Sequence, residues 1–212
     1  MSVARSDLEL EVNYILGNPD SASALVVNWV NRAYQRITQD VEFPQAHKLY
    51  FGQSFVANTY KYSLPADYFS IYALYNSTLS KRISQESQDR FLTRDFTKKG
   101  DPTIYAIFGS QYWVWRTPSA DYGAGDTMHL HYRKLFATLD NDTDLIEIND
   151  SWATAVIWEA AIYGYEARGE VERATVLRGR LNAFVNQHRK TLAEELIDRN
   201  EGIQVVGVGG VS

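Results

Sequence analysis

The fold is decided by residues 150–198, which read DSWATAVIWEAAIYGYEARGEVERATVLRGRLNAFVNQHRKTLAEELID. Apolar residues recur there at spacings of three and four, which is the period of an α-helix. They form one stripe before Gly169 and another after it: Trp152, Val156, Ala160, Tyr163 and Ala167, then Ala174, Leu177, Leu181, Phe184, His188, Leu192 and Leu196. Asp150 stands where an N-cap is expected, and Gly169 stands where a helix stops. The stretch therefore predicts two helices broken at Gly169, the second about 40 Å long.

The first of these helices has a further apolar stripe, made by Trp158, Ala161 and Tyr165, that needs a partner. The N-terminal region offers two short amphipathic helices. The apolar positions are Leu8, Val12, Ile15 and Leu16 in the one, and Leu25, Trp29, Ala33, Ile37 and Val41 in the other. Gly17-Asn18-Pro19 ends the first, Ser21 or Ser23 can cap the second, and Phe43-Pro44 closes it. We expect these helices to cover the free stripe, so that both ends of the chain form one bundle.

Between the two ends the apolar period changes from about 3.6 to two, which is typical of half-buried strands. Alternation is clearest at Tyr60, Tyr62 and Leu64 and at Met128, Leu130 and Tyr132. Residues 103–108 and 111–116 flank Gly109-Ser110, a two-residue connection that predicts a hairpin. Further strands are expected around residues 49–55 and 71–75, and a short helix over 84–96.

Together these patterns predict an α+β fold in which an antiparallel β-rich domain is inserted into a helical bundle. The bundle is expected to be discontinuous, with residues 1–44 and 139–198. The β-rich insertion is expected to span residues 45–138, and residues 199–212 an extended C-terminal arm.

Composition excludes several classes of protein. The 212 residues include 21 basic and 26 acidic ones, a net charge of −5, which disfavours a protein that grips nucleic acid through its phosphates. There is no cysteine, and therefore no disulfide framework and no thiolate chemistry. We find no apolar run of membrane-spanning length and no signal-peptide core, so we expect a soluble protein made in the cytoplasm.

Three stretches carry a resemblance to a known family. They are Asn31–Ile37 (NRAYQRI) on an early helix, Tyr62–Phe69 (YSLPADYF), and Gly100–Tyr105 (GDPTIY) ahead of the aromatic hairpin. With helices at both ends, a β-rich middle and a thin C-terminal arm, the chain resembles the head-to-tail connector (adaptor) proteins of tailed bacteriophages.

The resemblance implies a structural virion protein with neither catalytic centre nor cofactor. Connectors of that family form a ring, usually of twelve copies, beneath the portal at the neck of the virion. Their partners are the portal, the next tail protein (nozzle, stopper or tube) and further copies of themselves, and genomic DNA passes through without specific binding. The alternatives are another tail tube or head-completion component, or a tail-associated cell-wall hydrolase.

The last ten residues mix β-branched residues with glycines and show no helical period. The apolar positions are Ile203, Val205, Val206, Val208 and Val211. Such a segment is costly to order alone but could add as a strand to the sheet of a partner. The resemblance assigns this arm to portal docking. The alternative is a frayed chain end.

Two further regions are candidates for protein contacts. The hairpin carries Tyr112, Trp113 and Trp115, with Tyr105 and Phe108 nearby, which favours a core or subunit contact over a sugar-stacking surface. Residues 117–126 form a long connection, and we predict an interaction loop that includes Pro118, Tyr122, Gly123 and Gly125.

Three patterns of titratable residues also need an interpretation. His129 and His131 share a strand face but have no third ligand at a suitable spacing, so we interpret them as solvent-facing residues and predict no metal site. Asp140, Asp142 and Asp144 imitate a calcium loop. Leu145 and Ser151 stand where its glycine and its last glutamate belong, so a turn with solvated carboxylates is favoured. Glu159 and Glu166, seven apart on one helix face, are the pair that a hydrolase would use.

Overall fold

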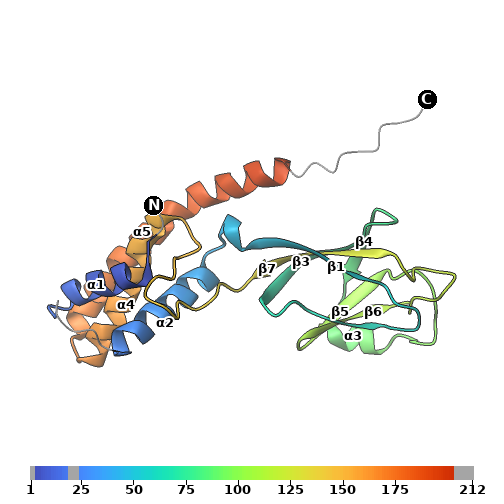
Figure 1. The fold of residues 1–212 in the computed structure, drawn as a ribbon, viewed down its shortest axis with the longest axis horizontal. Coiled ribbons are helices and arrows are strands. Elements are labelled where there is room, and N and C mark those ends of the chain that lie inside the picture. Colours follow the sequence, from blue (N-terminus) through green and yellow to red (C-terminus); the bar gives the residue numbers. More distant parts are fainter. Residues whose placement is uncertain (1–2, 19–23, 203–212) are drawn as a thin grey trace. The chain divides into compact units, whose positions relative to one another are not determined.

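The computed structural model describes the backbone of residues 3–18 and 24–202, with the side chains of these ranges except 51–52 and 193–202 (Figure 1). The chain divides into two compact units. The first, here called the helical unit, comprises Met1–Ala46 and Phe136–Ser212, and the second, the β unit, comprises His47–Leu135. Each unit has a hydrophobic core of its own. The fold is therefore α+β, with helices at both ends of the chain and an inserted sheet, as the sequence predicts.

The helical unit joins elements from both ends of the chain. Its helices are α1 (Arg5–Ile15), α2 (Ala24–Asp40), α4 (Ala153–Ala167) and α5 (Val171–Gly202), with short 3-10 turns η1 (Pro44–Ala46) and η2 (Asp150–Trp152). Figure 1 shows α1 and α2 alongside α4, and both pack on it. The predicted helix stop at Gly169 is confirmed, and its φ of 76° suits a residue without a side chain.

Close approach between α4 and the N-terminal helices depends on Gly164. A Cβ atom there would lie 2.6 Å from Leu16 Cδ1 and 3.2 Å from Trp29 Cζ3. The adjacent Tyr165 donates a hydrogen bond of 2.7 Å through its hydroxyl to the carbonyl of Ile15. Trp158 of the same stripe lies against α5 instead, with its ring centroid 5.9 Å from that of Phe184. The N-terminal helices thus cover α4 around Gly164 and Tyr165, which confirms the expected bundle.

Three details of the helical unit differ from the prediction. The cap is Asn149, not Asp150: its side chain accepts a 3.0 Å hydrogen bond from the amide of Ser151, and a 3-10 turn precedes α4. Leu25 is 60 % exposed, because α2 turns Val26, Val30, Ala33 and Ile37 inward instead. The last helix continues through Gly202, past the predicted helix end at Asp198.

The β unit is a curled seven-stranded sheet. Its strands are β1 (His47–Ser54), β2 (Lys61–Ser63), β3 (Tyr68–Asn76), β4 (Lys81–Gln85), β5 (Ile104–Phe108), β6 (Gln111–Trp115) and β7 (Thr127–Lys134), in the order β1-β7-β3-β4-β5-β6-β2. The first and last strands of this order approach each other, since Gln53 Nε2 donates to the carbonyl of Ser63 at 3.2 Å. The curl encloses the side chains that alternate inward, including Met128, Leu130 and Tyr132.

The inserted sheet is mainly antiparallel, as the sequence predicts, but one of its pairings is parallel. Strands β4 and β5 pair in parallel, Ser84 with Ile104 and Gln85 with Tyr105. Parallel neighbours need a crossover, and the short helix α3 (Gln88–Leu92) lies within it. The expected helix over 84–96 is therefore shorter, and its first residues belong to β4. The hairpin at Gly109-Ser110 is confirmed, with Gly109 at φ 59°.

The part of the chain that the structure describes contains no helix with the length and apolar character needed to cross a bilayer.

Candidate functional site

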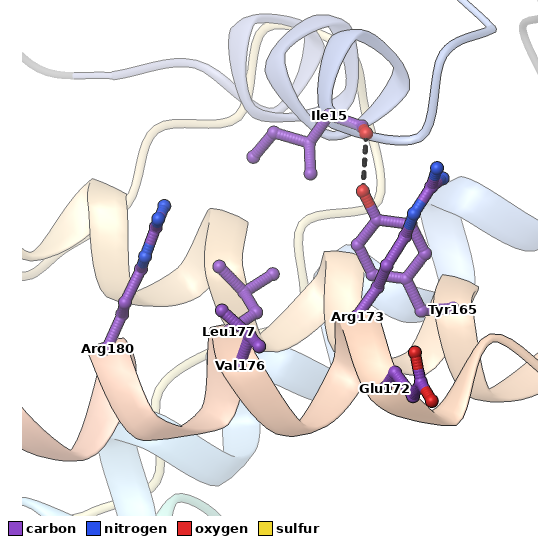
Figure 2. Close-up of a pocket in the computed structure, with 7 residues that line it drawn as sticks. All are labelled: Ile15, Tyr165, Glu172, Arg173, Val176, Leu177 and Arg180. Atoms are coloured by element: carbon purple, nitrogen blue, oxygen red, sulfur yellow. Dashed lines mark hydrogen bonds between the residues drawn. The ribbon is translucent and has the colours of Figure 1, made fainter.

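An open groove on the helical unit is lined by α1, α4 and α5. It has a volume of about 370 Å³ and is lined by Ile15, Tyr165, Glu172, Arg173, Val176, Leu177 and Arg180. Figure 2 shows Ile15 and Tyr165 on one side, joined by their hydrogen bond, with the residues of α5 opposite. The groove arises where α5 diverges from α1 beyond the turn at Gly169.

The groove combines an apolar floor with a charged rim. Leu177 is buried, whereas Val176 is 60 % exposed and Val171, one turn earlier on α5, is 66 % exposed. The Arg173 guanidinium pairs with Glu170 at 2.7 Å and lies 5.8 Å from the Tyr165 ring centroid. An apolar floor of Val176 and Leu177 beneath a charged rim is an arrangement that a protein partner could fill. Sequence reasoning missed this groove, although Val176, which lies off the buried stripe, was a signal for it.

The predicted interaction loop over residues 117–126 is held by backbone hydrogen bonds. Ser119 and Tyr122 exchange amide hydrogen bonds of 2.8 and 3.1 Å, and the amide of Gly125 donates to the carbonyl of Phe55 at 2.7 Å. Gly123 and Gly125 have φ values of 74° and 88°, which glycine adopts without strain. Pro118 is buried, but Tyr122 is 60 % exposed.

The aromatic hairpin contributes to the interior of the β unit on one face. Tyr105 and Tyr112 are buried in its core, and burial raises the pKa of Tyr105 to about 12. On the other face the ring centroids of Trp113 and Phe108 lie 4.3 Å apart. The Phe108 ring in turn contacts the fully buried Phe91 of α3. The hairpin thus packs against a helix, and its half-buried tryptophans remain at the edge of that packing.

Both histidines of β7, His129 and His131, are partly buried, so the interpretation of them as solvent-facing residues is wrong. His131 is half-buried rather than facing solvent, with its ring centroid 5.0 Å from that of Tyr72 and 5.7 Å from that of His47. Burial, and then the neighbouring His47, lower the pKa of His131. Among the residues that the structure describes, no group of three or more His, Asp or Glu side chains is placed to hold a metal ion.

The aspartate-rich turn is organised by an arginine that sequence reasoning missed. Arg5, only 8 % exposed, donates to the carbonyls of Leu139 and Asp140 at 3.1 and 2.7 Å and pairs with Asp142. Asp144 is not simply solvated, because its carboxylate accepts a hydrogen bond of 2.8 Å from the backbone amide of Asn141. Hydrogen bonding from this backbone lowers the pKa of Asp144. The turn is therefore a structured connection.

The two glutamates of the hydrolase alternative have different roles. Glu159 is buried and its carboxylate binds Arg36 Nη1 at 2.6 Å. Glu166 is exposed and pairs with Arg178 at 2.6 Å. A glycosidase needs two carboxylates that face one sugar ring from opposite sides. One buried and one surface carboxylate, each held by its own arginine, do not form that arrangement.

The predicted portal-docking arm, Ile203, Val205, Val206, Val208 and Val211, lies outside the described residues.

A family model described as SU10 adaptor protein matches residues 4–201 of the chain. No curated protein matches the chain.

Proposed function

Because this chain belongs to the SU10 adaptor protein family, we propose that it is a head-to-tail connector of a bacteriophage virion, one copy of a ring seated beneath the portal. The family's adaptor role is structural, and it implies contacts with other virion proteins. The match over residues 4–201 carries the proposal, since it spans both the helical unit and the β unit. In this role the ring continues the DNA channel from the head to the next tail protein at the virion neck.

The surfaces of the molecule support a docking role. The groove of the helical unit exposes Val176 beside Arg173 and Arg180. The loop of the β unit exposes Tyr122, an amphipathic aromatic of the kind enriched at protein interfaces. A connector needs at least two such surfaces, because it binds one partner above it and another below. We assign the loop around Tyr122 to the next tail protein.

The C-terminal arm completes the proposal. Residues Ile203, Val205, Val206, Val208 and Val211 would add as a strand to the portal, with main-chain hydrogen bonds giving affinity and the valines giving specificity. Main-chain pairing of this kind would couple assembly of the ring to binding of the portal.

The test is reconstitution with purified portal rings, imaged by electron microscopy. The intact chain should add a second ring to the portal, and a chain ending at Gly202 should not. The matched control is the Glu201→Gln variant, which alters the last helix but keeps the arm, and it should bind as the intact chain does. Failure of the intact chain to bind portal rings would refute the connector role. Equal binding by the truncated chain would refute only the role of the arm.

A further inference from the structure

The two units of the chain carry opposite charge. The β unit has eleven basic and seven acidic residues, a net charge of +4, whereas the helical unit has ten basic and nineteen acidic residues, a net charge of −9. The overall balance of −5 conceals this segregation. Two copies of such a chain attract each other when the β unit of one approaches the helical unit of the other.

The positive charge of the β unit includes a cluster at one corner of the sheet, here called the basic corner and defined as Lys98, Lys99 and Arg116. Backbone hydrogen bonds join its two segments: the amide of Thr117 donates to the carbonyl of Lys98 at 3.0 Å, and that of Gly100 to the carbonyl of Thr117 at 3.1 Å. All three cations are exposed. None of them forms an ion pair with a carboxylate of the described residues. Asp95 is near enough to interact electrostatically with Lys98 without pairing with it, so the corner keeps three exposed cations that carboxylates of a partner can approach.

The position of Arg116 is constrained by its surroundings. Its φ of 62° is unusual for a residue other than glycine. The arginine stem lies close to Gly100, since a Cβ atom built there would be in van der Waals contact with Arg116 Cδ at 3.4 Å. The Arg116 guanidinium lies 5.4 Å from the ring centroid of Trp115. The guanidinium of Arg94 lies 4.6 Å from the same centroid. Arg116 is thus held beside an indole, and less conformational entropy is lost when it binds an anion.

The complementary surface is residues 140–150 of the helical unit, here called the acidic loop. It carries Asp140, Asp142, Asp144, Glu147 and Asp150. Asp140 and Glu147 are exposed, and between them Leu145 is 50 % exposed. Arg5 and the carboxylate of Asp144 fix the start of the loop through hydrogen bonds to its backbone. The loop therefore presents carboxylates around one apolar side chain, as the basic corner presents cations around Trp115.

We propose that the basic corner of one copy docks on the acidic loop of a second copy. This inference rests on the proposed function and names the contact between neighbours in the ring. Because the contact joins two different patches, each copy can both give and receive it, so it repeats around a closed ring. A duplex is a weaker candidate, since nucleic-acid binding of ordinary strength neutralises about six to ten phosphates and the corner offers three cations.

Cysteine trapping tests the contact directly, because the chain contains no cysteine. Lys99→Cys and Thr143→Cys variants are mixed in equal amounts, with and without portal rings, and oxidised gently. We expect a disulfide-linked pair of chains on a non-reducing gel, lost in about 0.5 M salt, where the screening length falls to about 4 Å. Leu79→Cys, an exposed position in the β3–β4 turn, replaces Lys99→Cys as the matched control. Absence of a linked pair both in solution and on portal rings would overturn the proposal.

Charge reversal gives a second test. Lys98→Glu with Lys99→Glu reverses the corner, and Asp140→Lys with Glu147→Lys reverses the loop. Each variant alone should associate at least about tenfold more weakly in sedimentation velocity or in filling of the portal ring. An equimolar mixture of the two should recover association, since opposite charges again face each other. Normal association of either variant alone, or a mixture that stays dissociated, would overturn the proposal.

The two proposals fail in distinguishable ways. If the intact chain does not bind portal rings, the connector role fails whatever the variants do. If both reversed variants fill portal rings as the intact chain does, the connector role stands and the contact named here is wrong. If the corner-reversed variant instead loses retardation of duplex DNA in a gel while it still self-associates, the corner is a nucleic-acid contact.

Discussion

In the helical unit small and aliphatic residues pack around a cluster of aromatic rings centred on Trp152, whereas the β unit fills its core with tyrosines whose hydroxyls reach polar partners. Gly164 lets α4 approach α1 and α2 in the first. In the β unit the Tyr112 hydroxyl donates a hydrogen bond of 2.8 Å to the side chain of Gln53, and the Tyr132 hydroxyl donates one of 2.7 Å to the carboxylate of Asp67. Stability in the helical unit should therefore depend chiefly on volume, and in the β unit on hydrogen bonds.

The largest expected effect is on the helical core. Trp152 is 2 % exposed and meets Phe43 and Phe184 edge to face, with centroids 5.0 and 5.5 Å away. Trp152→Ala should lower the free energy of unfolding by about 3–5 kcal/mol, measured by urea denaturation. The matched control is Trp113→Ala in the β unit, where the indole is half-buried and the loss should be smaller. Equal losses would contradict the proposed difference between the units.

The next effect concerns the one ion pair with a buried carboxylate that sequence patterns did not reveal. The Glu159 side chain is 3 % exposed and its partner Arg36 is 51 % exposed. Arg36→Ala should cost about 1–3 kcal/mol, because it leaves a buried carboxylate without its cation. Adding Glu159→Gln to this variant should restore part of the lost unfolding free energy. A double-mutant cycle of the two single variants and the double variant would measure this.

Arg178→Ala is the control for this cycle. Its partner Glu166 has a side chain that is 45 % exposed, so the pair should contribute less than about 1 kcal/mol. If Arg178→Ala costs as much as Arg36→Ala, burial is not what distinguishes the two glutamates.

A smaller effect is expected in the β unit from the hydroxyl of Tyr132. Tyr132→Phe removes the hydrogen bond to Asp67 and should cost about 1–2 kcal/mol at neutral pH, measured by urea denaturation. Burial raises the pKa of Asp67, but hydrogen bonds from Lys48 and Tyr132 outweigh it and hold the pKa below its usual range. The stabilisation is present above the unfolded pKa, near about 4, and is lost as pH falls through the folded value. The difference between wild type and Tyr132→Phe should therefore shrink in acid, and a difference that stays constant down to about pH 3 would contradict this account.

The smallest effect is on the pH dependence set by His131. Burial and the neighbouring His47 lower its pKa, so the unfolded chain takes up the proton first as pH falls below about 6.5. Stability contributed by the neutral ring is present above that pH and is lost as pH falls through the folded value. His131→Gln should flatten the decrease in melting temperature over this window, while His129→Gln, two residues along the same strand, should alter it less. A decrease unchanged by His131→Gln would assign the pH dependence to other groups.

Much of the fold could be predicted because the patterns are local. The stripe of α5 holds at Ala174, Leu177, Leu181 and Leu192, and the hairpin closes at Gly109-Ser110. Helix ends were less predictable, since Asn149 and Asp150 are both competent caps and only the path of the chain selects between them. The parallel pairing of β4 with β5 could not be read from the sequence, because it depends on which strands meet after the crossover through α3.

The surfaces proposed for interaction could be predicted only in part. Tyr122 could be found from the composition of its loop, but the groove beside Val176 exists only where α1, α4 and α5 meet. The sequence by itself determined a bundle made from both chain ends with a β-rich insertion, since apolar periodicity depends on neighbours within a few residues. Tertiary structure alone decided which of two glutamates is buried, and which cations and carboxylates share a surface. Burial and charge clustering depend on residues that lie far apart in the chain.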